Sequence, residues 1–384
     1  MKYDFTTLNT GGGVHPFAAG EGVTDPNIIT FSVAEMRMNI APEITKAMHR
    51  IVDVGSFGYA PPEKTRFDAA VKNWMKQRHN WKIESDWVLQ SPGVVTAMGI
   101  AVRSLTKPGD GVIVQTPVYM HFYDQVENNN RVLVENPLIN HGGEWTMDFA
   151  DLEKKAADPR VKMMMLCSPH NPIGRVWTLE ELKRVGEICL KNNLYLFCDE
   201  IHFDLILEGK HTVITEAVQE LASRVVIGTA PSKTFNLAGN SLSNIIIPDS
   251  NTRARFKKDM EIHCGHYTGT FAYASTTAAY EEGAPWLDQL LEHLRENRTL
   301  LEKRMKEIIP DAVFSPLEGT YLQWIDLRCL KLNPDELIDK LKVAQIYVNN
   351  GVAFGSAGAG FIRFNLACPT SAIEAAMDRL AAIL

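Results

Sequence analysis

One stretch near the middle of the chain reads Val225-Val226-Ile227-Gly228-Thr229-Ala230-Pro231-Ser232-Lys233-Thr234. Its first half is apolar and β-branched, which predicts a buried strand, and the residues that follow predict a turn. A lysine therefore stands just beyond the end of a strand. Lysine is the side chain that condenses with aldehydes, so this position suggests an enzyme that forms a Schiff base. The competing interpretation is a solvated surface lysine.

Similar apolar runs precede this stretch, at residues 87–90, 112–115, 161–166 and 194–198. Turn or polar residues follow each run, and helical patterns separate them. Thr178 before Leu179-Glu180-Glu181, for example, is a capping-box signal for a helix that ends near Asn192. Strands that alternate with helices predict an α/β fold with a mainly parallel sheet and crossover helices.

The pattern changes toward the end of the chain. Residues 286–309 have the periodicity of one long amphipathic helix, and residues 319–327 alternate like a half-exposed strand. A helix over 334–344, a strand over 361–365 and a final helix follow. This α+β pattern predicts a second, smaller domain. We expect a large domain over residues 46–283 and a small domain from residues 1–45 and 284–384.

Composition narrows the classes of protein. A chain of 384 residues favours two packed units, and a net charge of −7 argues against a nucleic-acid-binding surface. We expect no membrane association, because no run approaches the roughly 20 apolar residues of a membrane span. The N-terminal residues lack the features of a signal peptide, so we expect a cytoplasmic protein. Its six cysteines are scattered, which argues against a disulfide framework.

Polar residues at the strand ends form the candidate site. Ligands of an open α/β sheet bind beyond the carboxyl ends of its strands, where this chain places Tyr119, Asn171, Asp199 and Lys233. A buried Asp199 needs a cation, which a protonated pyridine nitrogen supplies. Asn171 could donate to a phenolate oxygen, Tyr119 could stack on a ring, and the turn over residues 91–96 offers free backbone N–H groups to a phosphate. Together they predict a site for a heteroaromatic aldehyde with an anionic tail.

Each of these residues also has an ordinary interpretation. Asp199 could cap a helix, Asn171 could belong to a plain turn, and Tyr119 could be a core aromatic. Two further clusters favour their ordinary interpretation. We expect no metal site at His263-Cys264-Gly265-His266, because no second ligand pair lies at metal spacing. The glycines of residues 351–360 predict a turn, because no helix follows them as a dinucleotide-binding loop requires.

Four motifs of the chain resemble those of a known family. The motifs are Ser168-Pro169-His170-Asn171-Pro172-Ile173-Gly174, Asp199-Glu200-Ile201-His202, Ser232-Lys233 and Arg363, and they extend over nearly the whole chain. They resemble the fold-type I pyridoxal-phosphate enzymes of the class I/II aminotransferase superfamily. Residues 199–204, 230–239, 318–322 and 361–365 are most similar to its MalY/PatB branch, which comprises cystathionine β-lyases and cysteine-S-conjugate β-lyases.

The resemblance implies how the chain binds pyridoxal 5'-phosphate. It implies that Lys233 forms the Schiff base and moves protons, and that Asp199 keeps the pyridine nitrogen protonated. It assigns Asn171 to the ring oxygen and Tyr119 to the ring face, and His202 belongs to the same cofactor-binding set. The phosphate is assigned to the backbone of Val94 and Val95 and to Ser232.

The resemblance also implies substrate contacts and a partner. Arg363 is expected to bind the α-carboxylate of an amino-acid substrate, a bidentate task that lysine does poorly. Tyr321 is a candidate for the substrate pocket, and a buried strand position is the alternative. Tyr59 matches the tyrosine that reaches the phosphate of the neighbouring subunit, so a homodimer with shared active sites is implied.

Three departures from the family pattern bear on the site. His202 stands where the aspartate aminotransferases carry tyrosine, which fits the lyase branch. Ala230 stands where they carry a phosphate-binding serine, so the phosphate needs another hydroxyl, from Thr229 or Ser232. Residues 31–37 depart from the branch's usual Trp-Val-Ala-Asp-Met-Asp, which leaves the preference for substrate side chains open.

The predicted function is α,β-elimination from cystathionine or another S-substituted cysteine, giving a thiol, pyruvate and ammonia. An aminotransferase with the same site is the leading alternative, because both reactions need every residue named above. A regulatory protein that keeps the fold without catalysis is the second alternative. No DNA-binding segment is recognisable in the sequence, and all the key positions are intact, which argues against it.

Overall fold

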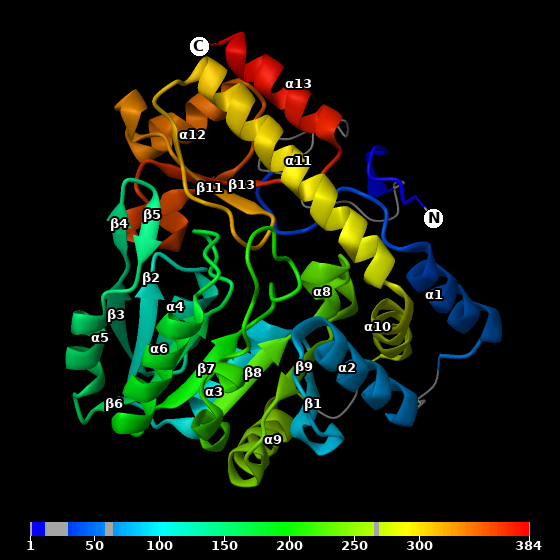
Figure 1. Ribbon diagram of the computed structural model, residues 1–384, viewed down its shortest axis with the longest axis vertical. Helices are drawn as coiled ribbons and strands as arrows, with labels where there is room; N and C mark the ends of the chain where they lie inside the picture. Colours follow the sequence, from blue (N-terminus) through cyan, green and yellow to red (C-terminus); the bar gives the residue numbers. More distant parts are fainter. Residues whose placement is uncertain (1, 12–29, 58–63, 265–268, 384) are drawn as a thin grey trace.

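A computed structural model describes residues 2–11, 30–57, 64–264 and 269–383 (Figure 1). Its largest feature is a seven-stranded sheet in the order β1-β9-β8-β7-β6-β2-β3. All neighbours pair in parallel except β9, which is antiparallel to both β8 and β1. The strands are β1 (Val88–Ser91), β2 (Gly111–Thr116), β3 (Val132–Pro137), β6 (Val161–Cys167), β7 (Tyr195–Asp199), β8 (Val225–Thr229) and β9 (Ser243–Ile246). The predicted α/β fold with a mainly parallel sheet is confirmed.

Helices cover both faces of this sheet, which explains why its central strands are apolar throughout. Successive side chains of a strand point to opposite faces. Met163 and Met165 therefore pack under α3 (Val94–Leu105), α4 (His121–Glu127) and α9 (Ser250–Cys264). Met164 joins the core on the opposite face, which includes α5 (Phe149–Ala156) and α6 (Leu179–Lys191). The predicted capping box of Thr178 and Glu181 begins α6 and is confirmed.

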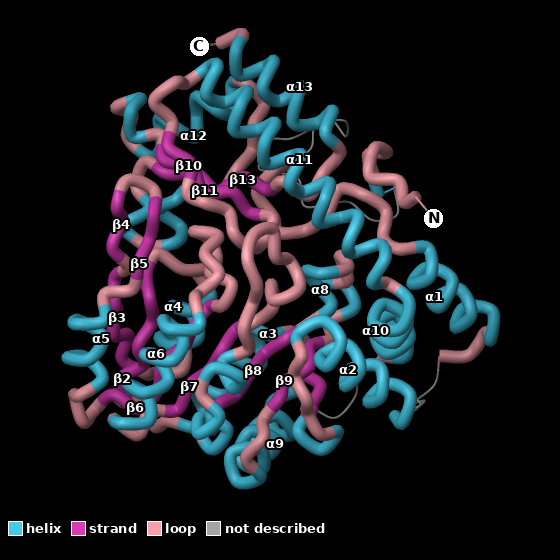
Figure 2. Tube along the Cα trace, viewed as in Figure 1, coloured by secondary structure: helices cyan, strands magenta, loops and turns pink. Residues whose placement is uncertain are grey.

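A second sheet lies beyond the carboxyl ends of the parallel strands, toward the top of Figure 1. It is antiparallel, in the order β10 (Val313–Phe314), β11 (Leu322–Asp326), β13 (Phe361–Asn365) and β12 (Asn349–Asn350). The predicted long helix is α11 (Ala284–Ile308), and α12 (Pro334–Val343) and α13 (Thr370–Ala381) lie near it. Loops fill much of the space between the two sheets (Figure 2).

The expectation of a half-exposed strand at residues 319–327 was wrong, because all five residues of β11 are buried. Aromatic packing is the reason. The Trp324 ring stacks on Phe361 at 5.2 Å between centroids and meets the Phe354 ring edge-on at 5.4 Å. Trp145, from the hairpin of β4 (Ile139–His141) and β5 (Glu144–Thr146), contacts Phe361 at 6.0 Å. The strand therefore has no solvent face.

The segment after residue 30 joins the second sheet through its backbone. The Phe31 N–H donates to the Tyr347 carbonyl at 2.7 Å, the Asn365 N–H donates to the Phe31 carbonyl at 2.9 Å, and the Arg37 N–H donates to the Ala367 carbonyl at 2.8 Å. On its other side, the Met36 N–H donates to the Asn236 Oδ1 at 2.9 Å, which ties the segment to the turn after α8 (Pro231–Thr234). The chain then enters α1 (Pro42–Val54), which packs on α10 (Thr270–Glu282), and α10 also contacts α2 (Lys64–His79). No helix among the described residues is long and apolar enough to cross a membrane.

Candidate active site

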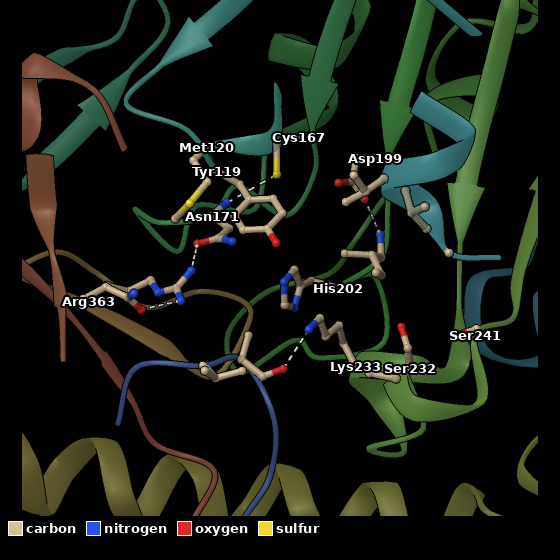
Figure 3. Close-up of a pocket in the computed structure, with 18 of the residues that line it drawn as sticks. Tyr119, Met120, Cys167, Asn171, Asp199, His202, Ser232, Lys233, Ser241 and Arg363 are labelled. Atoms are coloured by element: carbon tan, nitrogen blue, oxygen red, sulfur yellow. Dashed lines mark hydrogen bonds between the residues drawn. The ribbon is translucent and has the colours of Figure 1, made fainter. Parts of the chain in front are cut away.

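A cavity of about 340 Å³ opens at the carboxyl ends of the parallel strands. Its walls include Tyr119, Asn171, Asp199, His202, Lys233 and Arg363. With Val94, Val95 and Ser232, which also line it, the cavity brings together nine of the eleven residues predicted for the site. Figure 3 shows Arg363 on one side of this space and Ser232 and Ser241 on the other, with the remaining residues between them.

Lys233 lies in α8 (Pro231–Thr234), the short helix that starts directly after β8. Its Nζ donates to the Ala34 carbonyl at 2.7 Å. Burial, with the Arg363 cation as a second cause, lowers the lysine pKa from 10.5 to about 8. A lysine with a lowered pKa is neutral more often at physiological pH, and only the neutral amine attacks a carbonyl carbon.

Asp199 is the last residue of β7 and is buried. Burial raises the pKa of its carboxyl to about 7, although its Oδ1 accepts a hydrogen bond from the Ile201 N–H at 3.1 Å. Among the described residues no cation forms an ion pair with it. A buried carboxyl facing a cavity without a partner cation suits a ligand that carries a protonated nitrogen.

Asn171 and Tyr119 are held together by the backbone, because the Tyr119 N–H donates to the Asn171 carbonyl at 3.1 Å. The Asn171 Oδ1 accepts from the Arg363 Nη1 at 3.0 Å, which leaves its amide N–H groups as donors. Burial is the first cause that raises the Tyr119 pKa, so its phenol stays neutral. Both side chains can therefore contact a neutral ring and donate to an oxygen on it.

His202 is buried, and none of the described residues forms a hydrogen bond with its Nδ1. Burial lowers its pKa well below 6.5, with Lys233 and Arg363 as further causes. The imidazole is therefore neutral, with one ring nitrogen as donor and the other as acceptor. A buried polar atom without a partner at a cavity wall indicates that a ligand supplies the partner.

Arg363 is a buried cation whose hydrogen-bond acceptors are all neutral. Its Nη2 donates to the Ser32 carbonyl at 2.8 Å and to the Asn349 Oδ1 at 2.6 Å. Burial lowers its pKa from 12.5 to about 10, and its Nε has no hydrogen-bond partner within the part of the chain that the structure describes. A guanidinium held in place by neutral groups is free to bind an anion, and its planar fork matches a carboxylate.

The opposite end of the cavity offers donors to a second anion. Gly93, with φ +106°, turns the chain into α3, so the N–H groups of Val94 and Val95 belong to the first turn of the helix, and both residues line the cavity. Gly228 allows this approach, because a Cβ there would lie 2.8 Å from the Val94 Cγ1. Ser232 also lines this end.

The Thr229 hydroxyl donates to the Asn244 carbonyl at 3.2 Å inside the sheet. Of the two replacements considered for the missing serine at Ala230, the cavity wall contains Ser232 and not Thr229. Ser241 is a second hydroxyl there, with φ +50° after the short helix η4 (Ala238–Asn240). Ser241 was not predicted, because no local sequence pattern marks it.

Two further residues, Tyr321 and Tyr59, were also predicted for the site. The Tyr321 hydroxyl donates to the Ala34 carbonyl at 2.9 Å, and its ring stands edge-on to His202 at 6.0 Å, behind the cavity wall. Its role as a substrate contact stays a prediction. Tyr59 lies outside the described residues, as do Gly265 and His266 of the cluster that follows α9.

Backbone carbonyls of residues 32–35 also hold the site, and these contacts were not predicted. Ser32 and Ala34 accept from Arg363 and Lys233, and Asn365 holds the same segment through the Val33 and Glu35 carbonyls, each at 2.7 Å. Asn349 was missed as well. Backbone carbonyls have no residue-type signature, so no sequence signal could have found these contacts.

The fold and the cavity together define a lysine-dependent enzyme site for an amino acid and a ring-shaped aldehyde cofactor. Residues 26–380 match the family of class I and II aminotransferases. The chain belongs to this family, as its motifs predicted.

Individual relatives are similar over almost their full length. The chain is 39% identical to the cystathionine beta-lyase PatB of Bacillus subtilis over 365 residues, which cover 94% of each protein. It is 31% identical to the protein MalY of Escherichia coli, covering 91% of this chain and 89% of that one. Among solved structures, cystalysin from Treponema denticola, which contains pyridoxal 5'-phosphate, superimposes with a TM-score of 0.94 at 38% identity. That match covers 100% of this chain and 99% of the other. The expected MalY/PatB resemblance is confirmed.

Proposed function

We propose that this protein is a pyridoxal-phosphate-dependent carbon–sulfur β-lyase. It converts an S-substituted cysteine and water into a thiol, pyruvate and ammonia, with cystathionine as one candidate substrate. The observation that carries the proposal is the single cavity that joins Lys233, Asp199 and Arg363. The names of the relatives at 39% and 38% identity, a cystathionine beta-lyase and cystalysin, support the choice of reaction.

The residues that line the cavity fit pyridoxal phosphate. Lys233 would hold the aldehyde, Asp199 would pair with the pyridine nitrogen, and Asn171 with His202 would bind the ring oxygen; all four line the cavity. Tyr119 would pack on the ring face. The N–H groups that begin α3, together with Ser232 and Ser241, would bind the phosphate. When bound, the cofactor supplies an electron sink for the bond-breaking at the substrate α-carbon.

The chain's own groups perform the remaining tasks. Arg363 binds the α-carboxylate and so fixes the direction of the Cα–H bond. The neutral Lys233 amine takes the proton from Cα, with its Nζ beside the Ala34 carbonyl as an acceptor for one N–H. The bond from Cβ to sulfur then breaks, and the thiolate leaves with the electron pair. The buried Asp199 carboxyl would pair with a protonated ring nitrogen and so favour its charged form.

The competing function is transamination, which needs the same residues and which other members of the family perform. The test is to incubate the holoenzyme with cystathionine and with S-alkyl-cysteines in the absence of any 2-oxo acid. We expect pyruvate, ammonia and thiol in equal amounts over many turnovers. Product formation that requires a 2-oxo acid would assign the protein to the aminotransferases. Lys233→Ala is the control for non-enzymatic elimination.

We also propose a homodimer. The support is an apolar surface at the end of α1, where Val52, Val54 and Phe57 are 50%, 70% and 62% exposed. Phe57 leads directly to the segment that contains Tyr59, the tyrosine expected to reach the partner's phosphate. Light scattering on the purified protein should give twice the mass of 42.9 kDa. Phe57→Asp should lower the mass and the cofactor affinity, and a monomeric wild type would contradict the proposal.

The domain boundaries and the compartment are further proposals. A large domain over residues 46–283 would contain the seven-stranded sheet, and residues 1–45 and 284–384 would form the small domain with the four-stranded sheet. Limited proteolysis should cut first near these boundaries. Six free cysteines, four of them buried, support a reducing compartment and hence the cytoplasm. Cell fractionation tests that placement.

A further inference from the structure

A buried carboxylate that has no role in the proposed reaction contacts the helix that carries Lys233. Asp204 has a fully buried side chain, and three donors surround it. The Thr234 hydroxyl donates to its Oδ2 at 2.8 Å, the Trp74 Nε1 donates to its Oδ1 at 3.1 Å, and His79 meets Oδ1 through Nε2 at 2.7 Å. An indole N–H only donates, so the carboxylate is the acceptor of this cluster.

The three donors come from two helices, α2 and α8. Trp74 and His79 belong to α2, whereas Thr234 directly follows Lys233 at the end of α8. Asp204 itself ends the loop that begins at Asp199 and contains His202. One carboxylate therefore ties the lysine helix and the Asp199–His202 loop to the same long helix.

Packing holds the donors rigidly in place. The His79 ring stacks on Phe203 at 4.1 Å, and the Trp74 ring stacks on Tyr280 at 5.1 Å and meets Phe235 edge-on at 5.5 Å. The His211 ring stands edge-on to both Phe203 and His79, at 6.4 and 6.0 Å. His211 bonds Glu200 at 2.8 Å, and Glu200 also accepts from the Ile214 N–H at 3.2 Å. The loop between Asp199 and Asp204 is thus clamped at both ends.

The helix that carries Lys233 is too short for its own hydrogen bonds to fix its direction. It has four residues, and the Phe235 N–H to Pro231 carbonyl bond closes its one turn. A single helical turn is not stable alone, because nucleation costs more than its one hydrogen bond returns. Its direction, and with it the direction of the lysine stem, must come from tertiary contacts. Thr234 is the residue of α8 whose side chain is bonded to a buried charge.

We propose that Asp204 is a positioning residue for Lys233. Through the Thr234 hydroxyl it fixes the last turn of α8, so that Nζ is held at the distance from Asp199 and His202 that reaction with the cofactor aldehyde requires. The inference rests on the proposed function, since it assumes that Lys233 condenses with pyridoxal phosphate.

The test uses three threonine variants of the full chain. Thr234→Val removes only the hydroxyl that Asp204 binds, and Thr234→Ser keeps it. Thr252→Val is the matched control, because Thr252 is also buried and its hydroxyl bonds a carbonyl, that of Ser223 at the end of the short helix η3 (Gln219–Ser223). The first measurement adds pyridoxal phosphate to apoprotein and follows the rise of the visible band of the lysine-bound cofactor. The second separates kcat from KM, and the third is the melting temperature.

Thr234→Val should slow the rise of the visible band and lower kcat by about tenfold to a hundredfold, the range expected for a misplacement of about 1 Å, with KM within about twofold. Thr234→Ser should restore both rates, and Thr252→Val should leave both within about twofold of wild type while lowering the melting temperature. Equal rates in Thr234→Val and Thr252→Val would show that Asp204 serves folding alone and would overturn the proposal.

Asp204→Asn is a second variant with the same expectation, because an amide cannot accept from all three donors. If it unfolds, the threonine pair still decides the question. The two proposals fail in different ways. A wild type that forms no visible band with pyridoxal phosphate contradicts the cofactor assignment, whereas a wild type that forms the band but gives no pyruvate contradicts only the reaction. If the band instead forms at the same rate in the wild type and in Thr234→Val, only the positioning role of Asp204 is contradicted.

Discussion

The Lys233 amine is expected to be the most reactive lysine of the apoprotein near neutral pH, and the Arg363 charge is part of the reason. Burial is the main cause that lowers the lysine pKa, and Arg363 is the second. Replacing Arg363 by Met removes the second cause and keeps the first. The Lys233 pKa should therefore rise in Arg363→Met while staying below its ordinary value of 10.5.

The size of the wild-type effect follows from the pKa of about 8. At pH 7 a lysine with an ordinary pKa is neutral in about 0.03% of molecules, and one with a pKa of about 8 in about 10%, a difference of about 300-fold. Because an acylating reagent attacks only the neutral amine, its rate at Lys233 should exceed that of an exposed lysine by up to this factor, less the effect of access through the cavity mouth.

Trace labelling with acetic anhydride measures this rate for each lysine separately. Apoprotein is labelled briefly between pH 6 and pH 11, digested, and the acetylated fraction of each lysine peptide is read by mass spectrometry. The exposed Lys210 serves as the reference in the same digest. The Lys233 rate should climb tenfold per pH unit up to about pH 8 and then level off. In Arg363→Met the plateau should begin at higher pH.

The control is Arg328→Met, which removes a surface guanidinium that is 60% exposed and paired with Asp326. It should leave the Lys233 curve unchanged. A wild-type Lys233 rate that rises without a plateau through pH 10 would refute the reasoning, because it would mean that the amine is solvated like a surface lysine. A curve that does not respond to Arg363→Met would refute the electrostatic part alone.

Three other predictions concern the same cavity. Asp199→Asn should stabilise the apoprotein by about 4 kcal/mol above pH 7 and should have no effect below about pH 4. The reason is that the raised carboxyl pKa makes the stability of the wild type fall as the pH rises through this window. Urea unfolding at several pH values measures the difference in stability. Arg363→Lys should lower kcat/KM by about tenfold to a hundredfold through the lost fork, whereas Arg328→Lys should not. Gly228→Ala should cost about 1–3 kcal/mol and weaken pyridoxal-phosphate binding, because its Cβ would press on Val94, and the added change Val94→Ala should restore both.

The part of the site that sequence could predict is the part tied to strand ends. Asp199 and Lys233 each follow an apolar run that is buried on both faces, and such runs are visible in sequence. Parallel strands bring their carboxyl ends to one edge, so the sheet alone places these residues together. The long helix α11 was predictable for a similar reason, because its apolar stripe repeats over several turns.

The unpredicted part depends on segments that meet only in the folded chain. The Ser32 and Ala34 carbonyls reach the site because residues 31–37 pair with the second sheet, and Asn349 reaches Arg363 across neighbouring strands. Neither contact follows from the type of residue or from local periodicity. The complete burial of β11 has the same origin, since the Phe354 and Phe361 rings cover it from elsewhere in the chain.

Three ionisable groups in the cavity have pKa values that are shifted mainly by burial. Burial lowers the pKa of Lys233 and of Arg363 and raises that of Asp199, so each group is shifted toward its neutral form. The protein's own contacts with these groups are mainly neutral carbonyls, amides and N–H groups. A ring nitrogen that carries a proton reverses the shift of Asp199, and a carboxylate reverses that of Arg363. Ligands therefore supply the favourable electrostatic interactions that these buried groups lack in the apoprotein. Burial of these groups thus lowers the stability of the apoprotein and favours tight binding of the ligands. It follows that pyridoxal phosphate should raise the melting temperature of the wild type more than that of Asp199→Asn, and equal shifts would contradict this account of the site.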